Sequence, residues 1–203
     1  GPRFYERREV KDALAYLRVV YNPDDGESLR RIINLPPRGI GDKTLDALAR
    51  WAEGEHLSLP RSLLRMNEMA RAEREERLPL SGRSRNALLE VADLLAVLTE
   101  ARDALPLPDL LTFILDKSGY SAFLMDGTEE GEERVGNVRE LVAATVRYAE
   151  LPTEAALPTF LEEVALFADA DELPERSDVV TLLTLHAAKG LEFDVVFLPG
   201  WEE

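Results

Sequence analysis

The spacing of apolar residues along the chain predicts a series of amphipathic helices. In the first segment, residues 6–21, apolar side chains recur at helical intervals, at Val10, Ala13, Leu14, Leu17, Val20 and Tyr21. Charged residues, Asp12 among them, occupy the opposite face. Because a helix that packs on one side repeats its apolar positions with a period near 3.6, this pattern indicates one buried face. The turn-forming run NPDDG at 22–26 is expected to end the helix.

The same periodicity predicts seven further helices, at residues 27–34, 42–52, 68–77, 83–104, 110–118, 134–146 and 160–168. The segment 83–104 has only a narrow polar stripe, so we expect it to be the central buried helix. Ser81 is placed to cap it. The acidic runs at 125–133 and 169–175 are expected to be a surface loop and a linker.

The charged run at 68–77 has a different composition from the other predicted helices. Positive and negative side chains alternate along it, and Glu73 precedes Arg77 by four residues. Oppositely charged residues at this spacing are neighbours on a helix surface. The run therefore predicts an exposed helix stabilised by ion pairs along its own surface.

The last stretch, residues 179–203, has a different pattern. Two short apolar runs, Val179–Leu185 and Val195–Leu198, flank a polar turn at 186–192. Runs of this length are typical of buried strands in a parallel sheet, where the turns that follow strand ends commonly bind ligands. The predicted fold class is therefore mostly α, with short β-strands at the C-terminal end.

The segment LPPRGIGDKT at 35–44 lies between two of the predicted helices. Gly39 and Gly41 flank Ile40, which can insert into a core, and Asp42 is placed to cap the following helix. Glycines allow a backbone to approach a phosphate closely, and a helix N-terminus offers unpaired N–H groups and a positive dipole end. The pattern predicts a helix-hairpin-helix-like element.

Two basic residues, Arg38 and Lys43, bracket this hairpin. They are the expected partners of a DNA phosphate, because cationic side chains supply most of the sequence-independent affinity for DNA. The alternative is a structural turn in which the glycines serve only tight geometry.

The overall charge limits how the chain could bind nucleic acid. With 39 acidic and 24 basic residues, the formal net charge is −15. Such a field repels DNA at long range, so any contact requires a local basic patch. The absence of cysteine excludes disulfides and thiolate metal sites. The chain has only two histidines and no GxSxG motif, so an independent hydrolase is not predicted. It also has no apolar run of the ~18 residues that a membrane span needs.

Two long segments resemble the UvrD/PcrA/Rep family of superfamily 1 DNA helicases. TLHAAKGLEF at 184–193 resembles the family's motif V, and residues 3–46 resemble the segment that leads into its helical 2B domain. The order and spacing of both segments fit the family, so the resemblance covers essentially the whole chain. The phosphate loop GxxxxGK[ST] is missing from the sequence, which therefore looks like a piece of a helicase.

The resemblance implies a domain organisation. Gly1 and Pro2 are expected to be the remnant of a cleaved tag. Residues 3–20 would be an N-terminal piece of the RecA-like 2A domain, residues 21–177 the helical 2B domain, and residues 178–203 the return to 2A with motif V. The family's Arg-x-Glu-Asn motif appears at 134–137 as RVGN, with glycine in place of the acid.

The resemblance also implies the site residues. DNA contacts are expected at the duplex backbone for Arg38, Gly39, Ile40, Gly41, Lys43 and Thr44, and at single-stranded DNA for Thr184 and His186. The nucleotide is expected to contact Glu192, with Lys189 and Gly190 shaping the turn.

The function implied for the intact protein is that of a bacterial, cytoplasmic, ATP-dependent 3'-5' DNA helicase in repair or replication. It would use ATP and Mg²⁺ and could bind repair proteins. This chain alone is expected to bind no cofactor and to be inactive. Its own role is either to contact duplex DNA and regulate unwinding, or to act as a non-catalytic protein-interaction and autoregulatory module.

Overall fold

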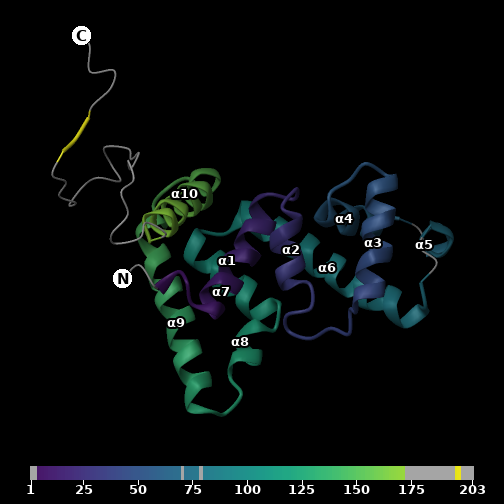
Figure 1. Cartoon of the computed structure of the whole chain (residues 1–203), viewed down its shortest axis with the longest axis horizontal. Coiled ribbons are helices and arrows are strands. Elements are labelled where there is room, and N and C mark those ends of the chain that lie inside the picture. The colour runs from purple at the N-terminus through teal and green to yellow at the C-terminus, as the bar shows by residue number, and fades with distance from the viewer. Residues whose placement is uncertain (1–3, 70, 78–79, 172–194, 198–203) are drawn as a thin grey trace, which may run out of the picture.

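A computed structural model describes residues 4–69, 71–77, 80–171 and 195–197 of the 203-residue chain. This part is almost entirely helical and contains no β-strand, which confirms the predicted mostly α fold class (Figure 1). Its elements are α1 (Arg8–Tyr21), α2 (Gly26–Ile32), α3 (Asp42–Gly54), α4 (Leu59–Glu68), α5 (Arg71–Arg77), α6 (Gly82–Ala104), α7 (Leu107–Lys117), α8 (Tyr120–Leu124), α9 (Glu129–Thr145), the 3₁₀ helix η2 (Val146–Tyr148) and α10 (Thr153–Asp171).

Helix α1 is the centre of the body. It is buried along most of its length and contacts α2, α6, α7, α9 and α10. The expectation that 83–104 would be the central helix is wrong, since α6 packs chiefly on α4 and leaves many side chains exposed. Asp12, expected on a polar face, is only 3% exposed, whereas Tyr21, expected inside, is 45% exposed. Neighbours surround α1, so its own periodicity does not define a single buried face.

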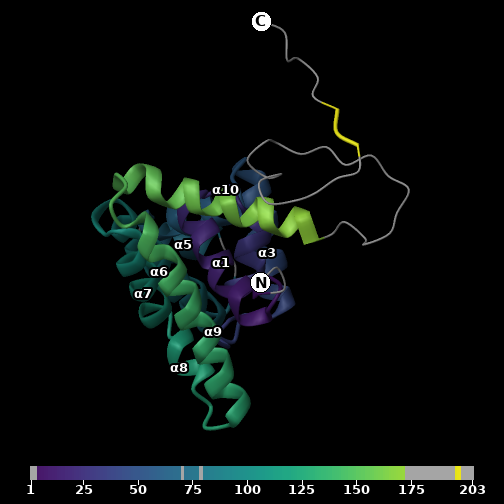
Figure 2. The same cartoon turned by 90° about the vertical axis from the view of Figure 1, so that its left-hand side faces the viewer.

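The remaining helices lie around α1, and most of them gather at the two ends of the body. Helices α3, α4 and α5 gather at one end, and α8 and α9 lie at the other (Figure 1). Helix α10 lies across the body and contacts α1, α6 and α7 (Figure 2). Packing thus places α1 within the helical body, although residues 3–20 were assigned to a neighbouring domain. The domain boundaries stay a prediction.

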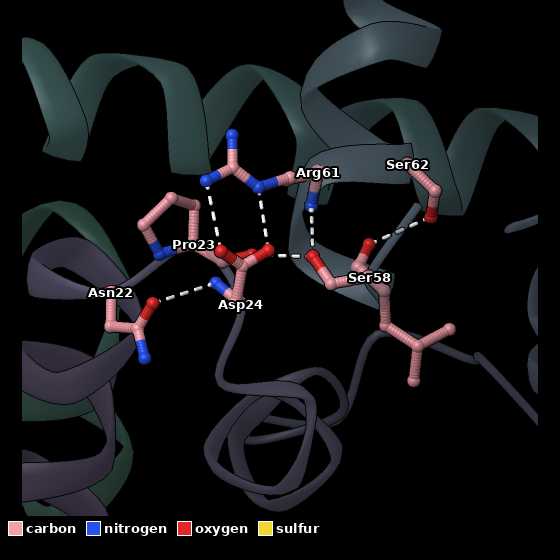
Figure 3. A network of polar contacts seen from close by, with 7 residues as sticks. Asn22, Pro23, Asp24, Ser58, Arg61 and Ser62 are labelled. Carbon is pink, nitrogen blue, oxygen red and sulfur yellow. Dashed lines mark hydrogen bonds and ion pairs between the residues drawn. The ribbon is translucent and has the colours of Figure 1, made fainter. Parts of the chain in front are cut away.

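A polar network joins the α1–α2 turn to the start of α4 (Figure 3). Arg61 donates from Nε and Nη2 to the two carboxylate oxygens of Asp24, at 2.6 and 2.9 Å. These hydrogen bonds hold the pKa of Asp24 below its usual range. Ser58 caps α4 by accepting from the Arg61 amide, and its hydroxyl donates to the carbonyl of Pro23 at 2.6 Å. Hydrogen bonds of Asp24, Ser58 and Arg61 therefore hold the α1–α2 turn against the start of α4.

One predicted helix cap and one predicted ion pair are confirmed. Ser81 caps α6 by accepting a hydrogen bond from the amide of Ser84. In α5, Nε of Arg77 lies 3.4 Å from a carboxylate oxygen of Glu73, as the spacing of charges predicted. Both features depend on residues close together in the sequence.

The acidic run at 125–133 is not simply the predicted loop. Helix α9 begins at Glu129, because the hydroxyl of Thr128 caps it by accepting from the amide of Gly131 at 3.0 Å. The glutamates of its first turn are favourable there, since a helix N-terminus carries a positive partial charge. Similarly, α10 continues to Asp171, into the stretch expected to be a linker.

The C-terminal strand predicted at Val195–Leu198 is absent from the residues that the structure describes there. The side chains of residues 195–197 are 62–83% exposed, and their backbone is in no strand. A strand requires hydrogen bonds to a neighbouring strand, and the described residues supply none. The predicted strand Val179–Leu185 and the motif V residues Thr184, His186, Lys189, Gly190 and Glu192 lie outside the described residues. None of the helices within the described ranges is long and apolar enough to cross a bilayer.

Tyr148 gives the protein a testable alkaline sensitivity. Burial, followed by its hydrogen bond to Glu163, raises the pKa of Tyr148 to about 12 from 10.0. A group with a raised folded pKa contributes stability below its unfolded pKa and loses it as pH rises through the folded value. We expect the thermal midpoint, followed by circular dichroism, to fall between about pH 10 and about pH 12. Tyr148→Phe should flatten this fall. Tyr21→Phe, at an exposed position, should not, and equal profiles for the two variants would contradict the assignment.

Candidate nucleic-acid interface

The α2–α3 turn, residues 33–41, and the start of α3 form the described part of the predicted DNA-binding surface. It connects the end of α2 at Ile32 to the start of α3 at Asp42. The side-chain oxygen of Asn34 accepts hydrogen bonds from the amides of Arg38 and Ile40, at 2.7 and 3.3 Å. Asn34 therefore closes the turn from within. Sequence reasoning missed this role, and the two prolines that follow at 36 and 37 were the only local feature that pointed to a turn here.

The two glycines of the turn have different conformations. Gly39 has a φ of 73°, in the left-handed region that glycine favours, and it is exposed. Gly41 has an extended φ of −88° and no neighbour within 4 Å of where a β-carbon would lie. Between them Ile40 is only 2% exposed and joins the core, as the sequence predicted. At its two exposed glycines the turn therefore presents backbone alone.

Arg38 points into the protein, away from the solvent-facing surface where a phosphate partner was expected. Its Nη2 donates to the hydroxyl of Tyr16 at 3.0 Å and to the carbonyl of Ser118 at 3.1 Å. Its Nη1 donates to three carbonyls at 3.0–3.2 Å, those of Ile32, Ile33 and Leu35. The last carbonyls of a helix lack partners within the helix, so a cation placed at the end of α2 satisfies them.

The start of α3 presents the groups that remain free to bind an anion. The N-cap is Gly41 and not Asp42 as predicted, because α3 includes Asp42 as its first residue. The amides of Asp42 and Lys43 donate to no group within the described residues, whereas that of Thr44 donates to the Gly41 carbonyl at 2.9 Å. Lys43 is exposed and forms no ion pair with any described residue. The side chain of Thr44 is 7% exposed and turned inward.

The turn between α7 and α8 packs against the α2–α3 turn. Besides the bond from Arg38 to the Ser118 carbonyl, a β-carbon on Gly119 would lie 3.8 Å from Cγ of Pro36. Gly119 has a φ of 78°, and the hydroxyl of Ser118 accepts from the amide of Tyr120. Sequence reasoning missed this neighbour, because nothing in the local pattern links segments so far apart in the chain.

A buried polar network continues from these turns into the core. The hydroxyl of Tyr120 donates to Asp12 at 2.8 Å, and Nε of Arg31 donates to the other oxygen of the same carboxylate at 2.7 Å. Burial, followed by the Asp12 charge, raises the pKa of Tyr120 well above its usual range. The hydroxyl of Tyr16 donates to the carbonyl of Leu35. Helices α1, α2 and α8 are thereby joined to the α2–α3 turn and the α7–α8 turn.

The described residues contain no cluster of side chains that could bind a metal ion such as Mg²⁺. No group of three histidine or carboxylate side chains within the described ranges could hold a metal ion. The residues expected at the nucleotide, led by Glu192, lie outside those ranges.

Comparison with known proteins identifies the family. The model of the UvrD-like helicase C-terminal domain matches residues 1–203. The chain belongs to this family. The resemblance drawn from motif V and the N-terminal segment is therefore confirmed.

Individual members of the UvrD-like family agree with this assignment. The chain is 38% identical over 210 residues to the ATP-dependent DNA helicase PcrA of Bacillus subtilis, 39% identical over 222 residues to the ATP-dependent DNA helicase UvrD1 of Mycobacterium tuberculosis, and 36% identical over 207 residues to DNA helicase II of Escherichia coli. Each alignment covers the whole of this chain and 27–28% of the relative. The chain thus spans just over a quarter of the length of these relatives.

Proposed function

We propose that this chain is the duplex-contacting 2B-type part of an ATP-dependent DNA helicase, and that the α2–α3 turn binds the phosphate backbone. The observation that supports this most directly is the start of α3. There, the amides of Asp42 and Lys43 and the Lys43 ammonium have no partner among the described residues, and they directly follow the exposed backbone of Gly41. The relatives named as DNA helicases support the same assignment.

The proposed contact uses the backbone more than side chains. A phosphate oxygen accepts hydrogen bonds from the amides of Asp42 and Lys43, where the helix dipole also favours negative charge. The ammonium of Lys43 adds a point charge, and the glycines leave room for the strand to approach. These groups carry no base specificity, so the contact reads the duplex backbone and not its sequence. The adjacent Asp42 carboxylate and the net charge of −15 keep the affinity low and sensitive to salt.

The remaining proposals concern the whole protein. Thr184 and His186 would contact single-stranded DNA, and Glu192, Lys189 and Gly190 would contact the nucleotide. ATP with Mg²⁺ would supply the phosphoryl transfer that drives 3'-5' unwinding in repair or replication. The sequence has no GxxxxGK[ST] phosphate loop. We therefore expect this chain by itself not to hydrolyse ATP, and turnover that co-purified with the chain through several columns would contradict this.

Replacing Lys43 with alanine should weaken duplex binding without affecting folding. Losing one phosphate contact lowers the slope of log affinity against log salt by about one. The measurement is fluorescence anisotropy with a labelled duplex carrying a single-stranded tail, titrated at several salt concentrations. Arg50→Ala, which removes an exposed cation two turns further along α3, is the matched control and should leave the slope unchanged. Equal slopes for all three proteins would refute phosphate binding at the turn.

A second candidate function is a protein-interaction and autoregulatory module. Phe123 and Met125, at the end of α8, are 41% and 60% exposed. Met125 also lines a pocket of about 290 Å³ between α7, α8 and α9, together with apolar residues such as Leu115 and Val138. Exposed apolar surface of this kind favours protein partners. This function predicts no dependence on Lys43, so the same anisotropy experiment separates the two candidates.

A further inference from the structure

We propose that Arg38 is a positioning residue. It holds the α2–α3 turn in its binding shape from inside the protein, together with Tyr16 and the turn at Ser118, and it is not itself a phosphate ligand. The consequence for DNA binding rests on the function proposed above. The positioning role rests only on the contacts of the guanidinium.

The guanidinium of Arg38 bridges three separate parts of the fold. Its two terminal nitrogens donate to five acceptors: three carbonyls at the end of α2 and in the turn, the Tyr16 hydroxyl on α1, and the Ser118 carbonyl 80 residues away. A planar fork with several donors can satisfy acceptors that lie in different directions at once. A lysine ammonium in the same place is a single point with three donors and cannot span them.

Use of Arg38 as a phosphate ligand would disrupt this arrangement. If its side chain turned outward, the carbonyls of Ile33 and Ser118 would lose the Arg38 donor, whereas the Ile32 carbonyl would keep its hydrogen bond from the Leu35 amide. Unsatisfied polar groups away from water are costly. In addition, the backbone N–H of Arg38 donates to the side-chain oxygen of Asn34 at 2.7 Å. The side chain and the backbone of one residue thus fix both sides of the turn.

Tyr16 makes the inference testable by a residue that cannot touch DNA. It is 2% exposed, donates to the Leu35 carbonyl and accepts from Arg38. Tyr16→Phe removes both bonds while preserving the ring. If the turn is held from within, this change should weaken duplex binding although the residue lies inside the protein.

The experiment compares the full chain with Arg38→Lys and Tyr16→Phe, using the labelled duplex and the salt series described above. We expect both variants to bind about three- to tenfold more weakly, in keeping with the loss of one or two hydrogen bonds. The salt slope should not change, because neither variant alters the number of cations at the phosphate. A phosphate-ligand role predicts the opposite: Arg38→Lys would retain the affinity, and Tyr16→Phe would have no effect.

A second measurement needs no DNA. Hydrogen exchange should become faster at the amides of Arg38 and Ile40, which Asn34 binds, in both variants. Exchange in the distant helix α9 should stay unchanged and serves as the control for global stability. Unchanged exchange at the turn would overturn the positioning role, whatever the DNA result. If the native chain binds no duplex at low salt, the proposed function fails, and the exchange data still decide the role of Arg38. If Arg38→Lys does not fold, Tyr16→Phe provides the test.

Discussion

Replacing Asp12 with alanine is expected to lower the free energy of unfolding by about 3 kcal/mol. The carboxylate is 3% exposed and binds two partners, Nε of Arg31 at 2.7 Å and the hydroxyl of Tyr120 at 2.8 Å. Alanine leaves the Tyr120 hydroxyl, on a residue that is 1% exposed, without its acceptor. Arg31 is 40% exposed at its side chain and can reach water, which keeps the loss toward the lower end of the range for buried pairs.

The measurement is equilibrium denaturation in urea, followed by far-ultraviolet circular dichroism. Lys11→Ala on the same helix is the matched control. Its ion pair with Glu6 has the same N–O distance, 2.7 Å, but the two side chains are 41% and 50% exposed. We expect the Lys11 change to stay within about 0.5 kcal/mol, since exposed pairs contribute little. Similar losses for Asp12 and Lys11 would show that burial of the network has no energetic consequence.

Gly131→Ala is expected to destabilise the protein by about 2 kcal/mol. A β-carbon at Gly131 would lie 2.3 Å from a carboxylate oxygen of Asp126 and 2.9 Å from the backbone carbonyl of Leu124. The aspartate cannot simply move aside, because it also accepts from Thr128 and from Arg134. The backbone carbonyl can move only with α8. The glycine therefore allows the tight connection between α8 and α9.

Gly136→Ala provides the comparison in the same helix. No atom lies within 4 Å of its β-carbon position, the residue is exposed, and its φ is not positive. Alanine is the better helix former, so this variant should gain about 0.5–1 kcal/mol. Both changes are read from the urea midpoint at constant slope. If Gly131→Ala also stabilised the protein, the close packing of α8 on α9 would be refuted.

The motif RVGN at 134–137, which contains Gly136, has a structural role on α9. Arg134 pairs with Asp126 at 2.6 Å, and Asn137 donates to Glu9 at 2.6 Å and accepts from Arg7. The glycine at the expected position of the acid leaves these contacts intact, since it faces solvent. Within the described residues, the motif connects α9 to α1 without that acid.

The sequence by itself determined much of the local structure and the family. Most of the helices follow from apolar periodicity, although α4 and α8 were not predicted. The cap at Ser81 follows from its hydroxyl before a helical run, and the pair between Glu73 and Arg77 from their spacing. These features depend on residues within one or two turns of each other, so one chain suffices to predict them. The word TLHAAKGLEF indicated the family, which the match over residues 1–203 confirms.

Only the tertiary structure decided which way Arg38 points and which helix is central. The acceptor of Arg38 on Ser118 lies 80 residues away, and the donor that binds Asp12 on Tyr120 lies 108 residues away. A sequence pattern shows that a residue can be charged and exposed on its own helix. It does not show which distant segment folds against that helix to offer a partner. For this reason Asp12 was expected at the surface and Arg38 at a phosphate, whereas packing around α1 buries Asp12 and brings the guanidinium of Arg38 to Tyr16 and Ser118.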